Sequence, residues 1–304
     1  MTAPGADVAP AREVTVVGVP ANSAGTADGV ARGPAVLRER GLAAVLASGP
    51  RRTDGGDVVV ALPARPQRGP SGLLAEDELV ATIGQVRAKV AAVRSAGSFP
   101  ILIGGDCPLL LGAVAALQDE DAAAGLLFVD GHEDAWPPLV SLTGEAADCE
   151  LGLALRLFDA GLDARLRAAL PRLRSEAVVV AGPRDAAEIA AAGVSTLAGR
   201  LRALIRPAEL STAAFAAAAA SLPWPFWLHV DLDVLATTEL AAVDYPQPGG
   251  LTWGQLTAIT AVGLGLAGCA GLSVCIYNPD LDGDGRGAAA VVAYLAQAIA
   301  LMTA

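Results

Sequence analysis

Six short segments of this chain are hydrophobic almost throughout, and longer polar or alanine-rich stretches separate them. They are residues 13–20, 99–105, 125–132, 176–183, 225–234 and 271–279. Strands that are apolar on both faces belong to sheets covered by helices on both sides, and alternating strands and helices are typical of parallel sheets. The sequence therefore predicts an α/β fold with three α/β/α layers around a mostly parallel central sheet.

The intervening segments carry helix signals. Residues 79–93 place apolar side chains at spacings of three and four, and alanine-rich 211–221 favours a helix by propensity. Thr252 and Gln255 form a capping-box pattern. Residues 48–75, rich in Pro, Gly and Arg, predict a surface excursion around one short strand. With no internal repeat, we expect residues 1–304 to form a single domain.

Composition narrows the class of protein. The chain is 53% hydrophobic with a formal net charge of −11, which argues against nucleic-acid binding because phosphates need clustered Lys and Arg. Neither a signal peptide nor a run of about 20 apolar residues is evident, so we expect no membrane association. The four cysteines lack the spacing of a disulfide framework. These features predict a cytoplasmic protein with a small-molecule substrate.

Polar residues gather where the predicted strands end. Residues 125–132 run into Asp130, His132 and Asp134, which are spaced two apart. The segment 225–234 repeats this spacing with His229, Asp231 and Asp233. Side chains two apart on extended backbone point the same way, and ligands of parallel sheets bind at the carboxyl ends of strands. We therefore expect both sets to converge.

A metal site explains this concentration of carboxylates. Packed carboxylates repel one another and take up protons unless a divalent cation lies among them. Oxygen-rich ligation with one or two imidazoles suits Mn²⁺, with Zn²⁺ or Fe²⁺ as alternatives. The competing interpretation is a solvated strand end with a hydrogen-bonded histidine.

These motifs resemble those of the ureohydrolase superfamily, which includes arginase, agmatinase and formiminoglutamase. The matching segments are "GGDC" at 104–107, "DGHED" at 130–134, "GPRD" at 182–185, "HVDLDVL" at 229–235 with "DYPQPGGLT" at 244–252, and "YNPDLD" at 277–282. They follow the superfamily's order over most of the chain. The resemblance implies an arginase-like fold and a homo-oligomer, either trimer or hexamer.

The resemblance also implies a site for two manganese ions. Asp130, His132, Asp134, Asp231 and Asp233 match five of its six ligands, with Asp130 and Asp231 as bridging carboxylates. Such a cation pair generates a nucleophile near neutral pH that attacks a trigonal carbon. The implied reaction is hydrolysis of a C–N bond.

The sixth ligand, a histidine in the superfamily, is Cys107 here. As a thiolate it would still bind metal and favour Zn²⁺, and the helix start predicted at Pro108 favours the thiolate. As a thiol it would be a buried spectator and leave one metal. A nucleophilic cysteine with His132 or His229 as base is the third alternative.

Other departures concern the substrate. Ile276 replaces the glutamate that binds guanidinium, and a buried guanidinium without that counter-charge would be destabilised. No histidine stands near Ala147, where the superfamily has a proton shuttle. Trp136 and Thr143 occupy the positions of an asparagine and a serine, and alanines follow the motif at 182–185 in place of acidic residues that hold an amino group. The pattern argues against an arginase or an agmatinase.

Three residues, His229, Glu145 and Asp148, are candidate replacements for the lost groups. His229 is a candidate ligand or general base, or else a core histidine. Glu145 and Asp148 are candidate substrate-binding groups, although acidic residues also favour helix starts. Trp136 is either a pocket wall or a packing residue.

We therefore expect a metal-dependent hydrolase of a C–N bond in a small non-guanidinium metabolite such as an amide, amidine or hydrazide. Asp134 or His229 would move the proton, and Ile276 would contact the substrate. The alternatives are a non-catalytic or regulatory relative, and an enzyme that performs condensation or ring closure at the same metal.

Overall fold

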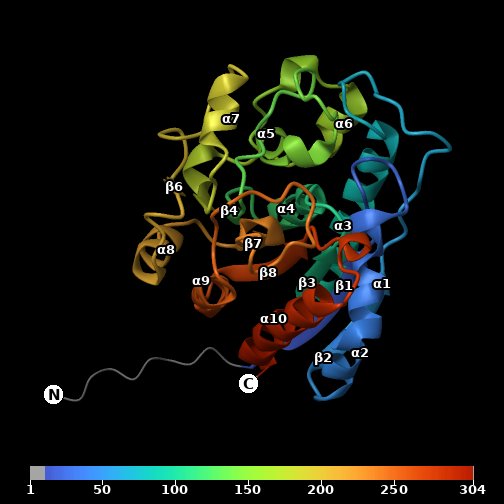
Figure 1. Cartoon of the computed structure of the whole chain (residues 1–304), viewed down its shortest axis with the longest axis vertical. Coiled ribbons are helices and arrows are strands. Elements are labelled where there is room, and N and C mark those ends of the chain that lie inside the picture. The colour runs from blue at the N-terminus through green and yellow to red at the C-terminus, as the bar shows by residue number, and fades with distance from the viewer. Residues whose placement is uncertain (1–10, 304) are drawn as a thin grey trace.

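A computed structural model describes residues 11–303 and contains one eight-stranded sheet (Figure 1). The strands are β1 (Glu13–Val19), β2 (Arg52–Asp57), β3 (Ser98–Gly104), β4 (Gly125–Val129), β5 (Val178–Ala181), β6 (Ala203–Ile205), β7 (Phe226–Asp231) and β8 (Cys269–Cys275). Their order is β2-β1-β3-β8-β7-β4-β5-β6, and every neighbouring pair is parallel. The predicted parallel α/β sheet is confirmed.

Helices cover both faces of the sheet. They are α1 (Gly33–Leu37), α2 (Ala43–Ala47), α3 (Glu76–Ser95), α4 (Leu109–Glu120), α5 (Glu150–Ala154), α6 (Ala164–Ala169), α7 (Ala186–Ala191), α8 (Thr212–Ala219), α9 (Trp253–Gly265) and α10 (Arg286–Thr303). Helices α3 and α4 pack together on one side, while α8, α9 and α10 follow one another on the other (Figure 1). The central strands are thus enclosed between two helical layers.

The sequence signals correspond closely to these elements. All six apolar segments contain strands, and every residue of β4 and β7 is buried. The capping box at Thr252 and Gln255 begins α9 with both reciprocal hydrogen bonds. Residues 48–75 contain β2, which pairs with β1 at the sheet edge. The sequence did not predict β6, a three-residue edge strand, because a strand so short shows no periodicity.

Strand order brings the functional segments together. The chain forms β1 and β3 in one half of the sheet and then crosses to β4 in the other half, leaving the centre for β7 and β8. The carboxyl ends of β3, β8, β7 and β4 therefore lie next to one another where the strand order reverses. Ligand sites of open parallel sheets form at such a point.

Helix α10 bears on the expectation of no membrane association. By length and composition alone it is long and apolar enough to cross a membrane. In this fold it contacts α9 and β1, and Val291, Leu295 and Ile299 are buried. A core helix meets the same criteria, so α10 is weak evidence for a span.

Candidate metal centre and pocket

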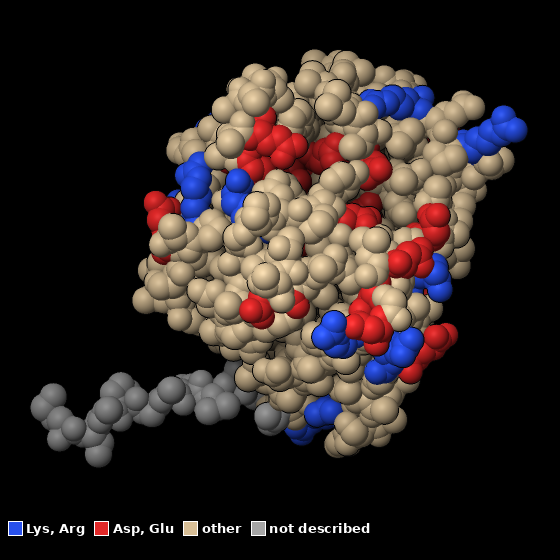
Figure 2. All heavy atoms as spheres, viewed as in Figure 1, with Lys and Arg blue, Asp and Glu red and all other residues tan. Residues whose placement is uncertain are grey.

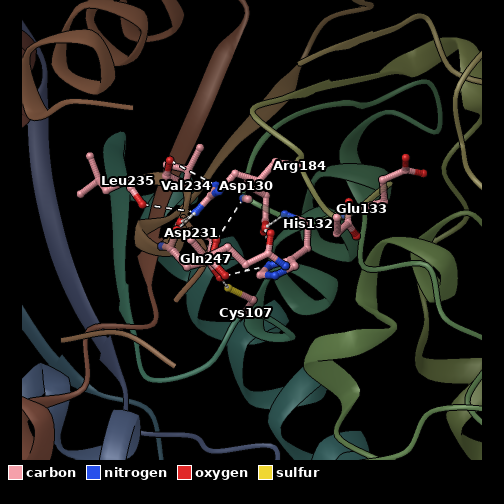
Figure 3. A network of polar contacts seen from close by, with 12 residues as sticks. Cys107, Asp130, His132, Glu133, Arg184, Asp231, Val234, Leu235 and Gln247 are labelled. Atoms are coloured by element: carbon pink, nitrogen blue, oxygen red, sulfur yellow. Dashed lines mark hydrogen bonds and ion pairs between the residues drawn. The ribbon is translucent and has the colours of Figure 1, made fainter. Parts of the chain in front are cut away.

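The ends of β4 and β7 bring a histidine and three carboxylates together (Figure 3). His132 Nδ1 lies 2.8 Å from Asp233 Oδ2 and 3.7 Å from Asp130 Oδ1. Asp231, the last residue of β7, accepts a hydrogen bond at 2.6 Å from the backbone N–H of Asp233. Four of the six residues expected to converge lie together here, whereas Asp134 lines the pocket described below and His229 lies deeper, within β7. We call these four residues the outer cluster.

Backbone donors hold one oxygen of each carboxylate in the outer cluster. The N–H of His132 donates to Asp130 Oδ1 at 2.7 Å, and the N–H of Gly131 donates to Asp233 Oδ1 at 3.0 Å. Asp130 Oδ2 is buried and has no hydrogen-bond partner among the described residues. The loop thus orients the carboxylates while leaving Asp130 Oδ2 free for another ligand.

The local charge balance is strongly negative. The carboxyl side chains buried at this edge include Asp130, Asp134, Glu150, Asp185, Asp231 and Asp233. Among the described residues nearby, Arg184 is the one guanidinium, and its nitrogens donate to the backbone carbonyls of residues 233–235 and 247. Burial and the charge of Asp233 raise the pKa of Asp130 to about 6. Burial, followed by neighbouring carboxylates, raises the pKa values of Asp134 and Asp231 well above their ordinary range.

His132 responds to the same field. Burial alone would lower its pKa, but the carboxylates of Asp233 and Asp130 outweigh burial and raise it to about 11. A divalent cation would take the place of this proton, because a metal-ligating histidine must be neutral. The free oxygen of Asp130 and the oxygen-rich donor set therefore fit a divalent cation.

Cys107 lies against the outer cluster. Its Sγ donates to Asp231 Oδ2 at 2.9 Å, and its side chain is 1% exposed. Burial raises its pKa well above the ordinary thiol value, with Cys275 and Asp231 adding to the effect. The expectation that the helix start would favour the thiolate is therefore wrong for the metal-free protein, although Pro108 does immediately precede α4.

His229 lies within β7 behind the outer cluster. Its Nδ1 is 2.7 Å from Ser273 Oγ, and its ring stacks on Phe128 with centroids 5.2 Å apart. Burial lowers its pKa to about 3, so the ring is neutral. His229 does not line the pocket described below, a position that does not support direct proton transfer to a substrate.

Two buried residues near this centre, Glu150 and Cys275, were not predicted from the sequence to lie there. Glu150 is the first residue of α5 and is 0% exposed, and neither of its carboxylate oxygens has a hydrogen-bond partner within residues 11–303. The available signal was a single charge in the apolar run at 149–155. Cys275 ends β8, where the sequence shows nothing unusual.

A pocket of about 340 Å³ opens over the outer cluster. This volume lies within the range of small-molecule sites. Its lining includes His132, Asp134, Trp136, Thr143, Ala147, Asp148, Asp185, Glu188, Asp231, Asp233, Asp244, Tyr245 and Ile276. Cys107 is not among the lining residues, so a substrate in this pocket would not contact its sulfur. A second pocket, of about 40 Å³ beside Asp106, is too small for a metabolite.

The predicted substrate residues occupy different parts of this pocket. Trp136, Asp148 and Ile276 line it directly. Asp148 accepts hydrogen bonds from Ser141 and Thr143, each at 2.5 Å. Glu145 lies behind the wall and accepts a hydrogen bond from Tyr245 at 3.2 Å.

Acidic side chains gather in a hollow of the face shown in Figure 2. Asp185 and Glu188, which flank the alanines after the motif at 182–185, both line the pocket. Alanines do follow the motif, as the sequence shows, but the acidic residues on either side of them still give this wall a negative charge. Asp185 precedes α7 and Glu188 lies in its first turn, so helix geometry turns both toward the pocket.

In protein freed of metal by a chelator, Glu145→Gln is expected to reduce the dependence of the Tm on pH. Burial, followed by the charges of Asp106 and Asp148, raises the pKa of Glu145 to about 7 from 4.5. The native pKa lies above the unfolded one, so its stabilising contribution is fully present below about pH 4.5 and is lost as pH rises through about 7. The Tm of the wild type should fall further than that of Glu145→Gln between about pH 5 and about pH 8. Equal falls would contradict this, and Tyr245→Phe, which keeps the carboxyl group, is the matched control.

Comparison with known proteins places the chain in a family. The sequence model of the Arginase family matches residues 12–302. The chain belongs to the arginase family. Enzymes of this family are hydrolases that act on carbon–nitrogen bonds.

Individual relatives are more distant. The chain is 29% identical over 197 residues to N(omega)-hydroxy-L-arginine amidinohydrolase of Streptomyces lavendulae, covering 61% of this chain and 66% of that protein. It is 28% identical over 175 residues to arginase of Brevibacillus brevis, covering 57% and 58%. Both matches span less than two thirds of the relative's length. The structure of arginase from Bacillus caldovelox superposes with a TM-score of 0.80 at 22% identity, covering 95% of this chain and 98% of that one. At this identity the likeness concerns the fold.

Proposed function

We propose that this arginase-family protein is a metal-dependent hydrolase of a C–N bond in a small metabolite whose reacting group is not a guanidinium. Amides, amidines and hydrazides are the favoured groups. The observation that carries the proposal is Ile276, which lines the pocket where the family resemblance places the guanidinium-binding glutamate. A guanidinium there would face an aliphatic side chain without its counter-charge, which is costly in a desolvated site.

The outer cluster would hold the metal. Asp130, His132, Asp231 and Asp233 supply oxygen and imidazole ligands, a set suited to Mn²⁺. A bound divalent cation pair activates water near neutral pH and polarises the substrate carbon. Asp134 lines the same pocket, and its backbone C=O accepts from the N–H groups of residues 151 and 152 at 3.0 and 3.1 Å. We assign it the transfer of the proton to the leaving nitrogen.

The acidic residues that line the pocket suggest which chemical group the substrate carries beside its reacting C–N bond. Asp148, Asp185 and Glu188 also line the pocket. A cationic amine would lie against these residues while a neutral C–N group lies beside Ile276 and the outer cluster. We therefore infer a small metabolite with an amino group at one end. We also retain the cytoplasmic location and the homo-oligomeric assembly as proposals, the latter on family resemblance.

Activity assays test this proposal. Release of ammonia from amino-acid ω-amides and amidines, or of hydrazine from hydrazides, should be detectable, abolished by EDTA and restored by Mn²⁺ or Zn²⁺. Asp233→Asn should abolish it, whereas Asp77→Asn, an exposed change far from the pocket, should not. Arginine, agmatine and formiminoglutamate should give no urea or formamide. Rapid urea release from arginine would contradict the proposal. A protein that is inactive on the whole panel, with or without added Mn²⁺ or Zn²⁺, would favour a non-catalytic relative.

A further inference from the structure

A second group of possible ligands lies deeper than the outer cluster. One ligand atom from each of Cys107, Asp130, Glu150 and His229 lies within 4.8 Å of the others. The four side chains come from the loop after β3, the end of β4, the start of α5 and the middle of β7. Each is 0% or 1% exposed. We call these residues the inner cluster; it shares Asp130 with the outer one.

Unpartnered atoms distinguish the inner cluster from an ordinary polar core. Asp130 Oδ2, both oxygens of Glu150 and His229 Nε2 are buried without any hydrogen-bond partner among the described residues. Buried polar groups are nearly always hydrogen-bonded, and an unpaired one destabilises the fold, more so if it is charged. Several such atoms around one point indicate that something else satisfies them.

The histidine is positioned as a ligand would be. Ser273 Oγ contacts Nδ1 at 2.7 Å and accepts from Trp227 Nε1 at 2.9 Å, which fixes one edge of the ring. The tautomer with its proton on Nδ1 then presents a lone pair on Nε2. A hydrogen bond on the far nitrogen is typical of metal-ligating histidines.

We propose that Cys107, Asp130, Glu150 and His229 bind a divalent cation, best matched by Zn²⁺, in an interior site beneath the pocket. One thiolate, one imidazole and two carboxylates form a set that Zn²⁺ accepts. Tetrahedral bonds of about 2.0–2.3 Å place ligand atoms about 3.3–3.8 Å apart, so each atom needs to move by about 1 Å or less. Glu150 and His229 are not ligands in the resemblance-derived set, so this site differs from the family pattern.

Cys275 offers the competing arrangement. Its Sγ lies within 4.8 Å of ligand atoms of Cys107 and His229, so these three residues form another possible group. A thiol packed among apolar residues behaves as a small hydrophobe and needs no cation. The carboxylate of Glu150 has no such alternative, and we therefore assign the cation to the side of Glu150. Cys275→Ala serves as the matched control.

Spectroscopy of Co²⁺-substituted protein tests the site directly, and it does not depend on the hydrolytic function. Co²⁺ bound to wild-type protein should give a near-ultraviolet thiolate-to-cobalt charge-transfer band that Cys107→Ser removes and Cys275→Ala retains. Glu150→Gln and His229→Gln should each weaken Zn²⁺ affinity by at least about 100-fold. Losing a residue that only hydrogen-bonds to a ligand would cost less. Asp233→Asn should abolish activity yet retain the band, which separates this site from the outer cluster. Circular dichroism checks that each variant folds.

Three results would overturn the assignment. The first is a wild-type spectrum without a thiolate band. The second is loss of the band in Cys275→Ala, which would move the cation to the group containing Cys275. The third is wild-type Zn²⁺ affinity in both Glu150→Gln and His229→Gln, combined with loss of the band in Asp134→Asn, which would restore the family arrangement.

Discussion

Asparagine in place of Asp130 is expected to eliminate cation binding and activity while stabilising the metal-free protein. Asp130 belongs to both the outer and the inner cluster, so its loss removes a ligand from each. Losing the metal would forfeit several kcal/mol of transition-state stabilisation, a rate reduction of more than about 10³-fold. Metal content by mass spectrometry and turnover of the identified substrate measure the two losses.

The gain in stability has a defined pH window. The pKa of Asp130 in the folded chain is about 6, raised from 3.8 chiefly by burial. A carboxyl group with a raised native pKa destabilises the fold above that value and not below about 3.8. Since one pKa unit corresponds to about 1.4 kcal/mol, Asp130→Asn should gain on the order of 3 kcal/mol at about pH 8 and little at about pH 4.

Urea denaturation of the chelated proteins measures this difference. Glu209→Gln, at an exposed position, is the control and should change little at either pH. A variant that loses metal and also loses stability at about pH 8 would indicate that Asp130 is a structural residue whose charge is satisfied within the fold.

Glutamate in place of Ile276 is expected to create affinity for guanidinium compounds. Ile276 has a φ of 72°, and its N–H donates to Gly105 O at 2.8 Å, which fixes the direction of its side chain in the pocket wall. Buried hydrogen-bonded charge pairs are worth about 2–5 kcal/mol by truncation. Ile276→Glu should therefore bind arginine or agmatine at least about 30-fold more tightly than wild type, as measured by calorimetry.

Glutamine at the same position separates charge from shape. Ile276→Gln has nearly the same size as the glutamate variant but lacks its charge, so we expect little gain in affinity. Equal affinity in the two variants, or strong arginine binding by the wild type, would contradict the role assigned to Ile276.

The sequence predicted the fold well because a strand buried on both faces appears in the sequence as an unbroken run of apolar residues. Both faces of β4 and β7 are covered, so their residues are apolar throughout. The edge strand β6 has only three residues, two of them partly exposed, so the sequence shows no apolar run there that is long enough to predict a strand. The outer cluster was predicted from the two-residue spacing, although its backbone is not extended: β4 ends at Val129, and residues 232–234 form a 3₁₀ turn. The pairing of β4 with β7 brings the two segments together.

The inner cluster was not accessible from sequence. Glu150, at the start of α5, lies near Cys107 and His229 only through tertiary packing of segments far apart in the sequence, which leaves no local pattern. His229 shows the same limit. Its spacing gave the correct face of β7, but not that the ring lies behind the pocket wall, where burial keeps it neutral.

Anomalous diffraction from crystals saturated with Mn²⁺ or Zn²⁺ tests the central claim, that cations hold these buried carboxylates together, most directly. We predict a peak between Asp130, His132 and Asp233. A map without anomalous density among these residues at saturating metal would contradict the account.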